Sequence, residues 1–113
     1  MSTIPSLMDF ELLFESSPVW VHEGGWFYGA RFVIERGADC LVVLIAPDEA
    51  ELSLKWLQGE RVILELKLLS VTEWHIQRRK GSEQLLTKVS GQRESLCLVT
   101  INPTVSVVYE AQW

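Results

Sequence analysis

The sequence predicts a mainly β fold: an antiparallel β-sandwich or partly open barrel of about eight to nine short strands, with one short N-terminal helix. Over most of the chain apolar and polar residues alternate with a period of two, which is typical of half-buried strands. Glycine, proline and asparagine interrupt these runs at short intervals, as the turns of antiparallel sheets do. The length of 113 residues suits a single domain, 1–113.

The helix is predicted near the N-terminus, before the alternating pattern begins. Ser6 can cap the first backbone N–H groups, and Asp9 lies near the positive end of the helix dipole. Three apolar side chains follow at helical spacing: Leu7, Phe10 and Phe14. We expect this helix to end before Pro18 and to pack Phe10 and Phe14 onto a sheet.

The next segments predict a hairpin and a central strand. Val19–His22 and Trp26–Tyr28 flank residues 23–25, a glycine-rich connection that suits a tight turn because glycine readily adopts positive φ. A strand at 31–35 follows. Cys40–Ala46 contains no polar residue, so we expect it to be a central strand that is covered on both faces.

The rest of the chain predicts a loop and six more strands. Pro47–Glu51 is expected to be a loop, because proline cannot donate to a strand ladder and acidic residues are poor strand formers. Arg61–Leu69 shows the clearest alternation, with four apolar residues on one side: Val62, Leu64, Leu66 and Leu68. The other predicted strands are 52–56, 71–77, 85–89, 96–101 and 105–109.

The charge is unevenly distributed along the chain. Residues 1–60 contain ten acidic and three basic residues, whereas residues 61–113 contain five acidic and seven basic residues, for a net charge of −5. An acidic surface repels phosphate backbones, so we expect no direct nucleic-acid binding and favour a basic protein partner. The basic run Arg78-Arg79-Lys80 is expected to lie at a hairpin turn and to blunt a sheet edge.

No arrangement of reactive residues predicts catalysis. His22 and Glu23 are adjacent, so they would point to opposite faces of a strand, and His75 would face away from Trp74 and Ile76. The histidines and cysteines lack metal-ligand spacing, and the sequence contains no phosphate-binding glycine loop or nucleophile elbow. We therefore expect no enzyme activity, no cofactor and no metal.

The cysteines and the apolar runs bear on the compartment. Cys40 and Cys97 lie in apolar strand-like runs, where free thiols behave as small buried hydrophobes. The longest apolar run, Cys40–Pro47, is far shorter than the roughly 20 residues that span a bilayer. The first residues lack the basic and apolar regions of a secretory signal. We expect a cytoplasmic protein that does not bind membranes.

An acidic loop and a tryptophan are the candidate binding groups. The densest acidic cluster, Asp48-Glu49-Ala50-Glu51, could imitate phosphate oxygens to a basic cleft, although a solvated loop is the simpler interpretation. Trp26 and Trp113 are the tryptophans expected to be partly exposed, and exposed aromatic rings often anchor interfaces, although core filling is the alternative. The predicted partner-binding residues are Glu23, Trp26, Asp48, Glu49 and Glu51.

The two strand-like runs 62–69 and 71–76 also carry a family resemblance. Val62-Ile-Leu-Glu-Leu-Lys-Leu-Leu69 followed by Val71-Thr-Glu-Trp-His-Ile76, in a compact acidic domain, resembles the small all-β immunity proteins of bacterial polymorphic-toxin and contact-dependent growth inhibition systems. The likeness covers Phe32 to Tyr109 as a pattern. It implies an antitoxin that neutralises a cognate toxin domain, often a nuclease with a basic active site, by occluding that site.

Two other classes of function remain open from the sequence. A small-molecule-binding barrel or sandwich would hold an apolar ligand among Trp20, Phe32 and Trp74, in an interior pocket of several hundred Å³, an order of magnitude typical of such sites. An enzyme ranks third, because the sequence places no reactive pair together. We expect the protein to be a monomer.

Overall fold

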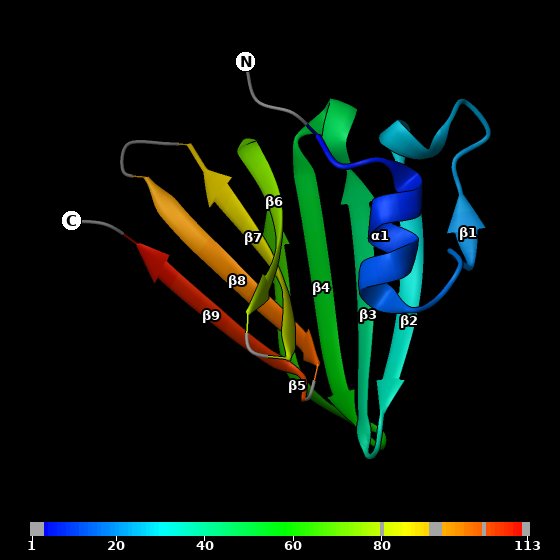
Figure 1. Ribbon diagram of the computed structural model, residues 1–113, viewed down its shortest axis with the longest axis vertical. Coiled ribbons are helices and arrows are strands. Elements are labelled where there is room, and N and C mark those ends of the chain that lie inside the picture. The colour runs from blue at the N-terminus through cyan, green and yellow to red at the C-terminus, as the bar shows by residue number, and fades with distance from the viewer. Residues whose placement is uncertain (1–3, 80, 91–93, 103, 112–113) are drawn as a thin grey trace.

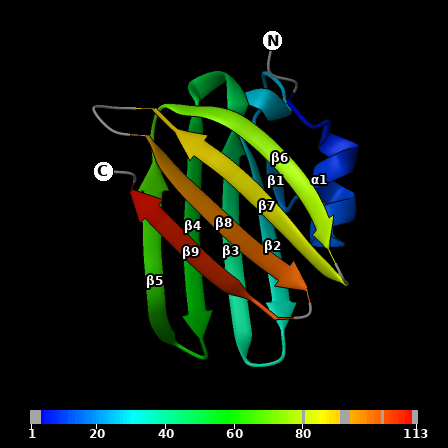
Figure 2. The same ribbon diagram turned by 60° about the vertical axis from the view of Figure 1, so that its left-hand side comes forward.

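Two antiparallel β-sheets packed face to face form the body of the protein, and one α-helix lies beside them (Figure 1). The computed structural model describes residues 4–79, 81–90, 94–102 and 104–111. The strands of the second sheet cross obliquely over those of the first (Figure 2). This architecture confirms the predicted antiparallel sandwich with a short N-terminal helix.

Within each sheet, strands that follow one another in the chain are also neighbours. Sheet A has the order β1-β2-β3-β4-β5, with β1 (Trp20–Val21), β2 (Ala30–Arg36), β3 (Asp39–Ala46), β4 (Glu51–Gln58) and β5 (Arg61–Leu68). Sheet B has the order β6-β7-β8-β9, with β6 (Val71–Arg79), β7 (Ser82–Val89), β8 (Ser95–Asn102) and β9 (Ser106–Ala111). Two 3₁₀ helices lie in connections of sheet A: η1 (Trp26–Tyr28) and η2 (Pro47–Glu49).

The two faces of the central strand β3 have different environments. Its inward side chains are fully buried in the core: Leu41, Val43 and Ile45. Its outward side chains are half-buried: Cys40, Val42 and Leu44. The prediction that Cys40–Ala46 is covered on both faces is therefore wrong for the described part of the chain. An uninterrupted apolar run shows that no side chain of the strand needs to face solvent. It does not show whether the fold has a second layer to cover the other face of the sheet.

The edge strand β5 confirms the alternation that the sequence shows. Leu66 and Leu68 pair with Leu54 and Leu52 of β4, and Leu68 is buried. The charged side chains between them are exposed: Glu65 and Lys67. The period of two therefore identified the strand and the inner face of its second half. Val62 was predicted on that face but is 46% exposed, at the point where the pairing with β4 shifts register.

The helix α1 (Leu7–Phe14) begins and ends where local chemistry predicts. The Asp9 N–H donates to Ser6 Oγ at 3.2 Å, and the Ser6 N–H donates to Asp9 Oδ2 at 2.9 Å, which completes a capping box. The Phe14 ring packs on Phe32 of β2 at 4.8 Å between centroids, and the Phe10 ring meets Trp74 of β6 at 6.3 Å. The helix thus joins the two sheets along one side of the sandwich.

The first hairpin differs from its prediction. Trp20 and Val21 pair with Arg31 and Ala30 of β2, whereas residues 26–28 form η1 and no strand. The Tyr28 N–H donates to the Gly25 carbonyl at 3.2 Å, so the three aromatic residues curl into one turn. Three consecutive aromatic residues contain no alternation to read, and the preceding glycine permits the tight turn at φ 135°.

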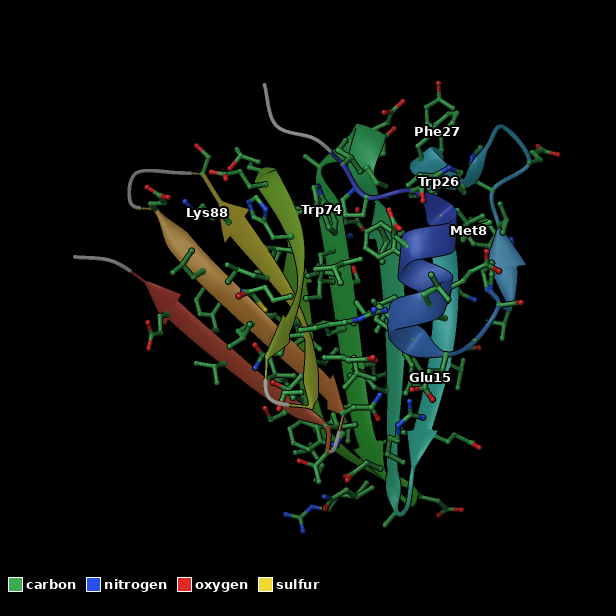
Figure 3. The ribbon with its side chains drawn as sticks, viewed as in Figure 1. Met8, Glu15, Trp26, Phe27, Trp74 and Lys88 are labelled. Carbon is green, nitrogen blue, oxygen red and sulfur yellow. The ribbon has the colours of Figure 1, made fainter. Side chains whose placement is uncertain are left out.

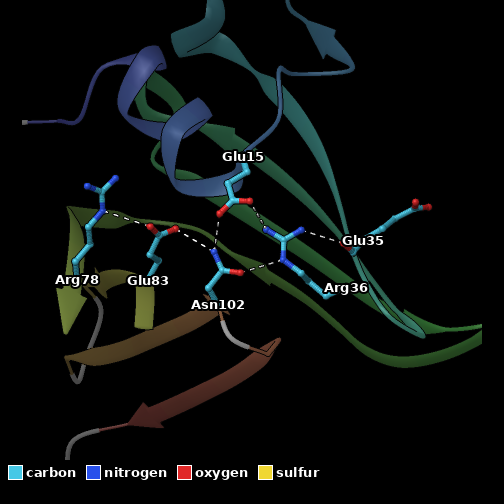
Figure 4. Close-up of polar contacts among 6 residues, drawn as sticks. All are labelled: Glu15, Glu35, Arg36, Arg78, Glu83 and Asn102. Carbon is cyan, nitrogen blue, oxygen red and sulfur yellow. Dashed lines mark hydrogen bonds and ion pairs between the residues drawn. The ribbon is translucent and has the colours of Figure 1, made fainter. Parts of the chain in front are cut away.

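A polar network closes the end of the sandwich at which α1 ends (Figure 4). The Asn102 side chain connects the two sheets: its Oδ1 accepts from Arg36 Nε at 3.1 Å, and its Nδ2 donates to Glu15 at 2.9 Å and to Glu83 at 3.1 Å. Arg36 also pairs with Glu15 at 3.5 Å, and Arg78 pairs with Glu83 at 3.6 Å. Each charged group in this network therefore has a partner within the chain.

Candidate functional site

The acidic loop lies at the opposite end of the sandwich from the polar network (Figure 1). Pro47 begins η2 and is buried, so the loop is fixed to the body of the protein at its first residue. Asp48 and Glu49 are exposed, whereas Glu51 is half-buried and accepts a hydrogen bond from Ser53 Oγ at 3.1 Å. Among the described residues, no cation pairs with Asp48, Glu49 or Glu51. Their charge is therefore available to a partner.

Trp26 lies beside this loop but faces largely inward. The helices η1 and η2 are in contact, so the structure does bring Trp26 close to the acidic residues. The Trp26 ring is half-buried and packs against Phe10 of α1 at 5.9 Å between centroids. Figure 3 shows Trp26 against the start of the helix and Phe27 farther out at the tip of the molecule. Trp26 thus couples the site to the core, and only part of its surface can meet a partner.

Glu23 lies in an exposed turn between β1 and η1 at the same end of the molecule. The turn is held by two hydrogen bonds, from the Gly25 N–H to the His22 carbonyl at 3.0 Å and from the Gly24 N–H to His22 Nδ1 at 2.9 Å. In Figure 1 the segment between β1 and η1 lies on the far side of η1 from η2.

Sequence analysis missed the exposed aromatic residues of this end. Trp20, Phe27 and Tyr28 expose 42%, 39% and 42% of their surface. The expected strand at 26–28 would have hidden alternate residues, but a single 3₁₀ turn between glycines leaves both Phe27 and Tyr28 outside. The run of three aromatic residues next to Gly24-Gly25 was the available signal. Trp113 and Lys80, also named from the sequence, lie outside the described residues.

The histidines are engaged in local contacts. His22 Nδ1 accepts a hydrogen bond from its own turn, and His75 Nε2 lies 3.0 Å from Glu73 Oε1 on exposed β6. The hydrogen bond with His75 is the main reason that the pKa of Glu73 lies below its usual value. Neither histidine therefore faces a nucleophile in the described structure.

The cysteines are free thiols, as predicted, but they differ in burial. Cys97 is fully buried on β8, and this burial raises its pKa to about 11. Cys40 is half-buried, and burial raises its pKa as well. The protonated form of each thiol is favoured, which makes both poor nucleophiles. Within the described residues, no group of three or more His, Cys, Asp or Glu side chains is arranged to hold a metal ion.

The residues proposed to line a small-molecule pocket do not enclose one together. Phe32 and Trp74 are packed in the core, whereas Trp20 is exposed on the edge strand β1. An open groove of about 590 Å³ lies between the start of α1 and β6, away from Trp20 and Phe32. In the described part of the chain, no helix is long and apolar enough to cross a membrane.

No protein-family profile and no curated protein sequence matches this chain. Among solved structures, it matches a chain of the contact-dependent growth inhibition toxin–immunity protein complex from Klebsiella pneumoniae 342. The match has a TM-score of 0.88 at 12% sequence identity and covers 98% of this chain and 97% of the other. The two chains share one fold over nearly their whole lengths. At the level of the fold, this agrees with the resemblance to proteins of contact-dependent growth inhibition systems.

Proposed function

We propose that this chain is an immunity protein that binds and neutralises a cognate toxin domain. The observation that carries the proposal is the full-length match to a chain of a toxin–immunity complex. A match over a short motif could reflect a common sheet arrangement, but here the match covers 98% of this chain and 97% of the other. The protein would act as a monomer in the cytoplasm of the cell that it protects.

The chemistry of the chain favours the immunity half of such a pair over the toxin half. A toxin enzyme needs reactive groups held within reach of one another. The described histidines are engaged in local contacts, and the buried Cys97 has a raised pKa. An inhibitor needs only a complementary surface, and the exposed carboxylates of Asp48 and Glu49 supply one.

We place the toxin-binding surface at the acidic end, formed by Glu23, Trp26, Asp48, Glu49 and Glu51. The toxin is proposed to be a nuclease whose active site is basic because it binds phosphate. The exposed carboxylates of Asp48 and Glu49 would enter that site in place of the phosphates and occlude it. Unpaired surface charges also steer association, so the rate of binding would depend on salt.

A growth assay tests the immunity role. The toxin is taken from the gene directly upstream of this one and is expressed with and without the chain. The chain should restore growth when it is present, and it should not slow growth when it is expressed alone. Growth arrest by the chain alone would show that it is the toxin half.

A charge-matched pair of variants tests the binding surface. Replacing Asp48, Glu49 and Glu51 with serine should slow association with the purified toxin and flatten its dependence on salt between about 0.1 M and 1 M. The control replaces three exposed acids elsewhere on sheet A, Glu35, Glu60 and Glu65, and changes the net charge of −5 by the same amount. Equal effects of the two triple variants in stopped-flow measurements would show that net charge matters and the loop does not.

A further inference from the structure

Four exposed aromatic rings form a continuous row at the acidic end. We call them the aromatic row: Trp20, His22, Tyr28 and Phe27. Their ring centroids are separated by 6.1 Å, 5.6 Å and 5.1 Å in that order. These distances are typical of aromatic rings in mutual contact. The row thus forms one connected surface rather than four isolated side chains.

Glycines hold the rings of the aromatic row in place. A Cβ atom at Gly29 would lie 2.9 Å from Cζ3 of Trp20, and one at Gly25 would lie 2.8 Å from Cζ of Phe27. A Cβ at Gly24 would lie 3.2 Å from both His22 and Tyr28. Each ring therefore packs directly against the backbone of a glycine, which has no side chain to hold the ring away. Rings ordered in advance lose little entropy when a partner binds.

The row is also connected to the core. Phe27 contacts Trp26 at 6.1 Å between ring centroids, and Trp26 contacts the fully buried Phe10 at 5.9 Å. The exposed rings are therefore the outer end of a stack of aromatic side chains that begins in the core. Such rigid anchors are characteristic of binding hot spots.

The chemistry around the row favours positively charged side chains. The guanidinium of Arg31 lies 5.5 Å from the centroid of the Trp20 ring, so the row already binds one cation of its own chain. Phe27 and Tyr28 have no such cation among the described residues, and η1, which contains them, contacts η2 with its exposed Asp48 and Glu49. Aromatic faces beside carboxylates offer two attractions to an arginine or lysine.

We propose that the aromatic row is a preformed site for arginine or lysine side chains of a basic protein partner. The inference deepens the proposed function, on which the identity of the partner rests, because it names the anchor residues of the interface. It moves the centre of that interface from the half-buried Trp26 to the exposed Tyr28 and Phe27.

A peptide titration tests the site without the toxin. The probe is hexa-arginine, followed by the NMR signals of the tryptophan indole N–H groups. The Trp20 signal should shift in a saturable way while that of the buried Trp74 stays fixed, and hexaglutamate should have no effect. Arg31→Gln removes the internal cation from Trp20 and should strengthen the binding of hexa-arginine, an effect that a purely structural role for the row does not predict.

Two variants test the site with the cognate toxin. Tyr28→Ser removes one ring of the row. Gly29→Ala removes no contact group, but its added Cβ atom displaces the Trp20 ring. The backbone at position 29 is extended and therefore accepts alanine. Each should weaken toxin affinity at least about tenfold in calorimetry. The matched control is Tyr109→Ser on β9, because Tyr109 is similarly exposed at 47%, and its affinity should stay within about twofold of the unaltered chain.

The outcomes separate this inference from the proposed function. Toxin binding that Tyr28→Ser and Tyr109→Ser affect equally would overturn the inference and leave the immunity role standing. A Trp20 shift with hexa-arginine, together with no toxin binding by the unaltered chain, would support the site and overturn the immunity role. Absence of the Trp20 shift would overturn the inference. Trp20 signals that change with protein concentration alone would also overturn it, because they would show that another copy of this chain occupies the site.

Discussion

The two ends of the sandwich use polar and aromatic side chains in opposite ways. At the end where α1 terminates, Asn102, Arg36, Glu15 and Glu83 bond to one another across the two sheets (Figure 4). At the other end, the carboxylates of Asp48 and Glu49 and the rings of Phe27 and Tyr28 are exposed and have no such partners among the described residues. The first end pairs its charged groups with one another and joins the sheets, whereas the second end keeps most of its groups available.

This contrast separates stability from recognition within one small domain. A buried or half-buried polar network contributes to stability when its members satisfy one another, and it then has little left to offer a ligand. Exposed groups contribute little to stability and can be used for binding. Substitutions at the two ends should therefore have separable effects on unfolding and on affinity.

The largest effect is expected where the aromatic end meets the core. Phe10→Ala should lower the free energy of unfolding by about 3–5 kcal/mol, because the fully buried ring supports Trp26, Phe14 and Trp74. Urea denaturation measures this. The control Phe27→Ala removes a ring that is 39% exposed, so it should cost clearly less stability than Phe10→Ala. Equal losses would show that the exposed rings are part of the core and would contradict the contrast between the ends.

An intermediate effect is expected in the polar network. Asn102→Ala leaves Arg36, Glu15 and Glu83 without their shared partner and should cost about 1–3 kcal/mol of unfolding free energy. Toxin affinity should remain within about twofold, since the network lies at the far end from the acidic loop. Thr104→Ala, an exposed change near the same turn, is the control. A loss of affinity with Asn102→Ala would show that the two ends are coupled.

The smallest effect concerns acid and the half-buried Asp39, also at the network end. Hydrogen bonds from Gln58 and from Trp56 hold the pKa of Asp39 below its ordinary value. Its contribution to stability is therefore present above about pH 4, the ordinary pKa of an aspartate, and is lost as the pH falls through the lower folded-state pKa. In the Asp39→Asn variant, the free energy of unfolding should therefore fall less steeply as the pH is lowered.

Gln58→Leu is the companion variant to Asp39→Asn. It removes the main donor, so it should reduce the acid slope in the same direction while leaving the carboxylate in place. Thermal unfolding between about pH 2 and 5 measures both variants. Unchanged slopes in both would show that these hydrogen bonds do not favour the ionised form.

Prediction from sequence succeeded where neighbouring residues hold the information. The capping pair Ser6 and Asp9 fixed the start of α1, and the alternation from Arg61 to Leu68 identified β5 and, from Leu64 onward, its inner side. The acidic loop was also found, because proline and consecutive acids exclude a strand. The sequence grouped Trp26 with this loop as partner-binding residues, and the contact of η1 with η2 brings the two close together.

The failures occurred where the answer depends on distant residues. The pairing of Trp20 with Arg31, rather than with the segment just after the glycines, was not visible in the local pattern. The exposure of Phe27 and Tyr28 also depends on a turn that removes them from any strand. An aromatic residue is compatible with core and surface alike, so its type alone could not decide between them.

The sequence by itself determined most of the secondary elements and the concentration of acid in the first half, because periodicity and charge are local properties. The exceptions are residues 26–28, where a 3₁₀ helix replaces the predicted strand, and the start of β5, where Val62 is exposed. Tertiary structure alone decided which strands pair, which face of β3 is covered, and which charges are satisfied internally at Asn102 or left free at Asp48 and Glu49. The physical reason is that burial and charge pairing are relations between segments far apart in the chain, and such relations exist only when the sheets have packed.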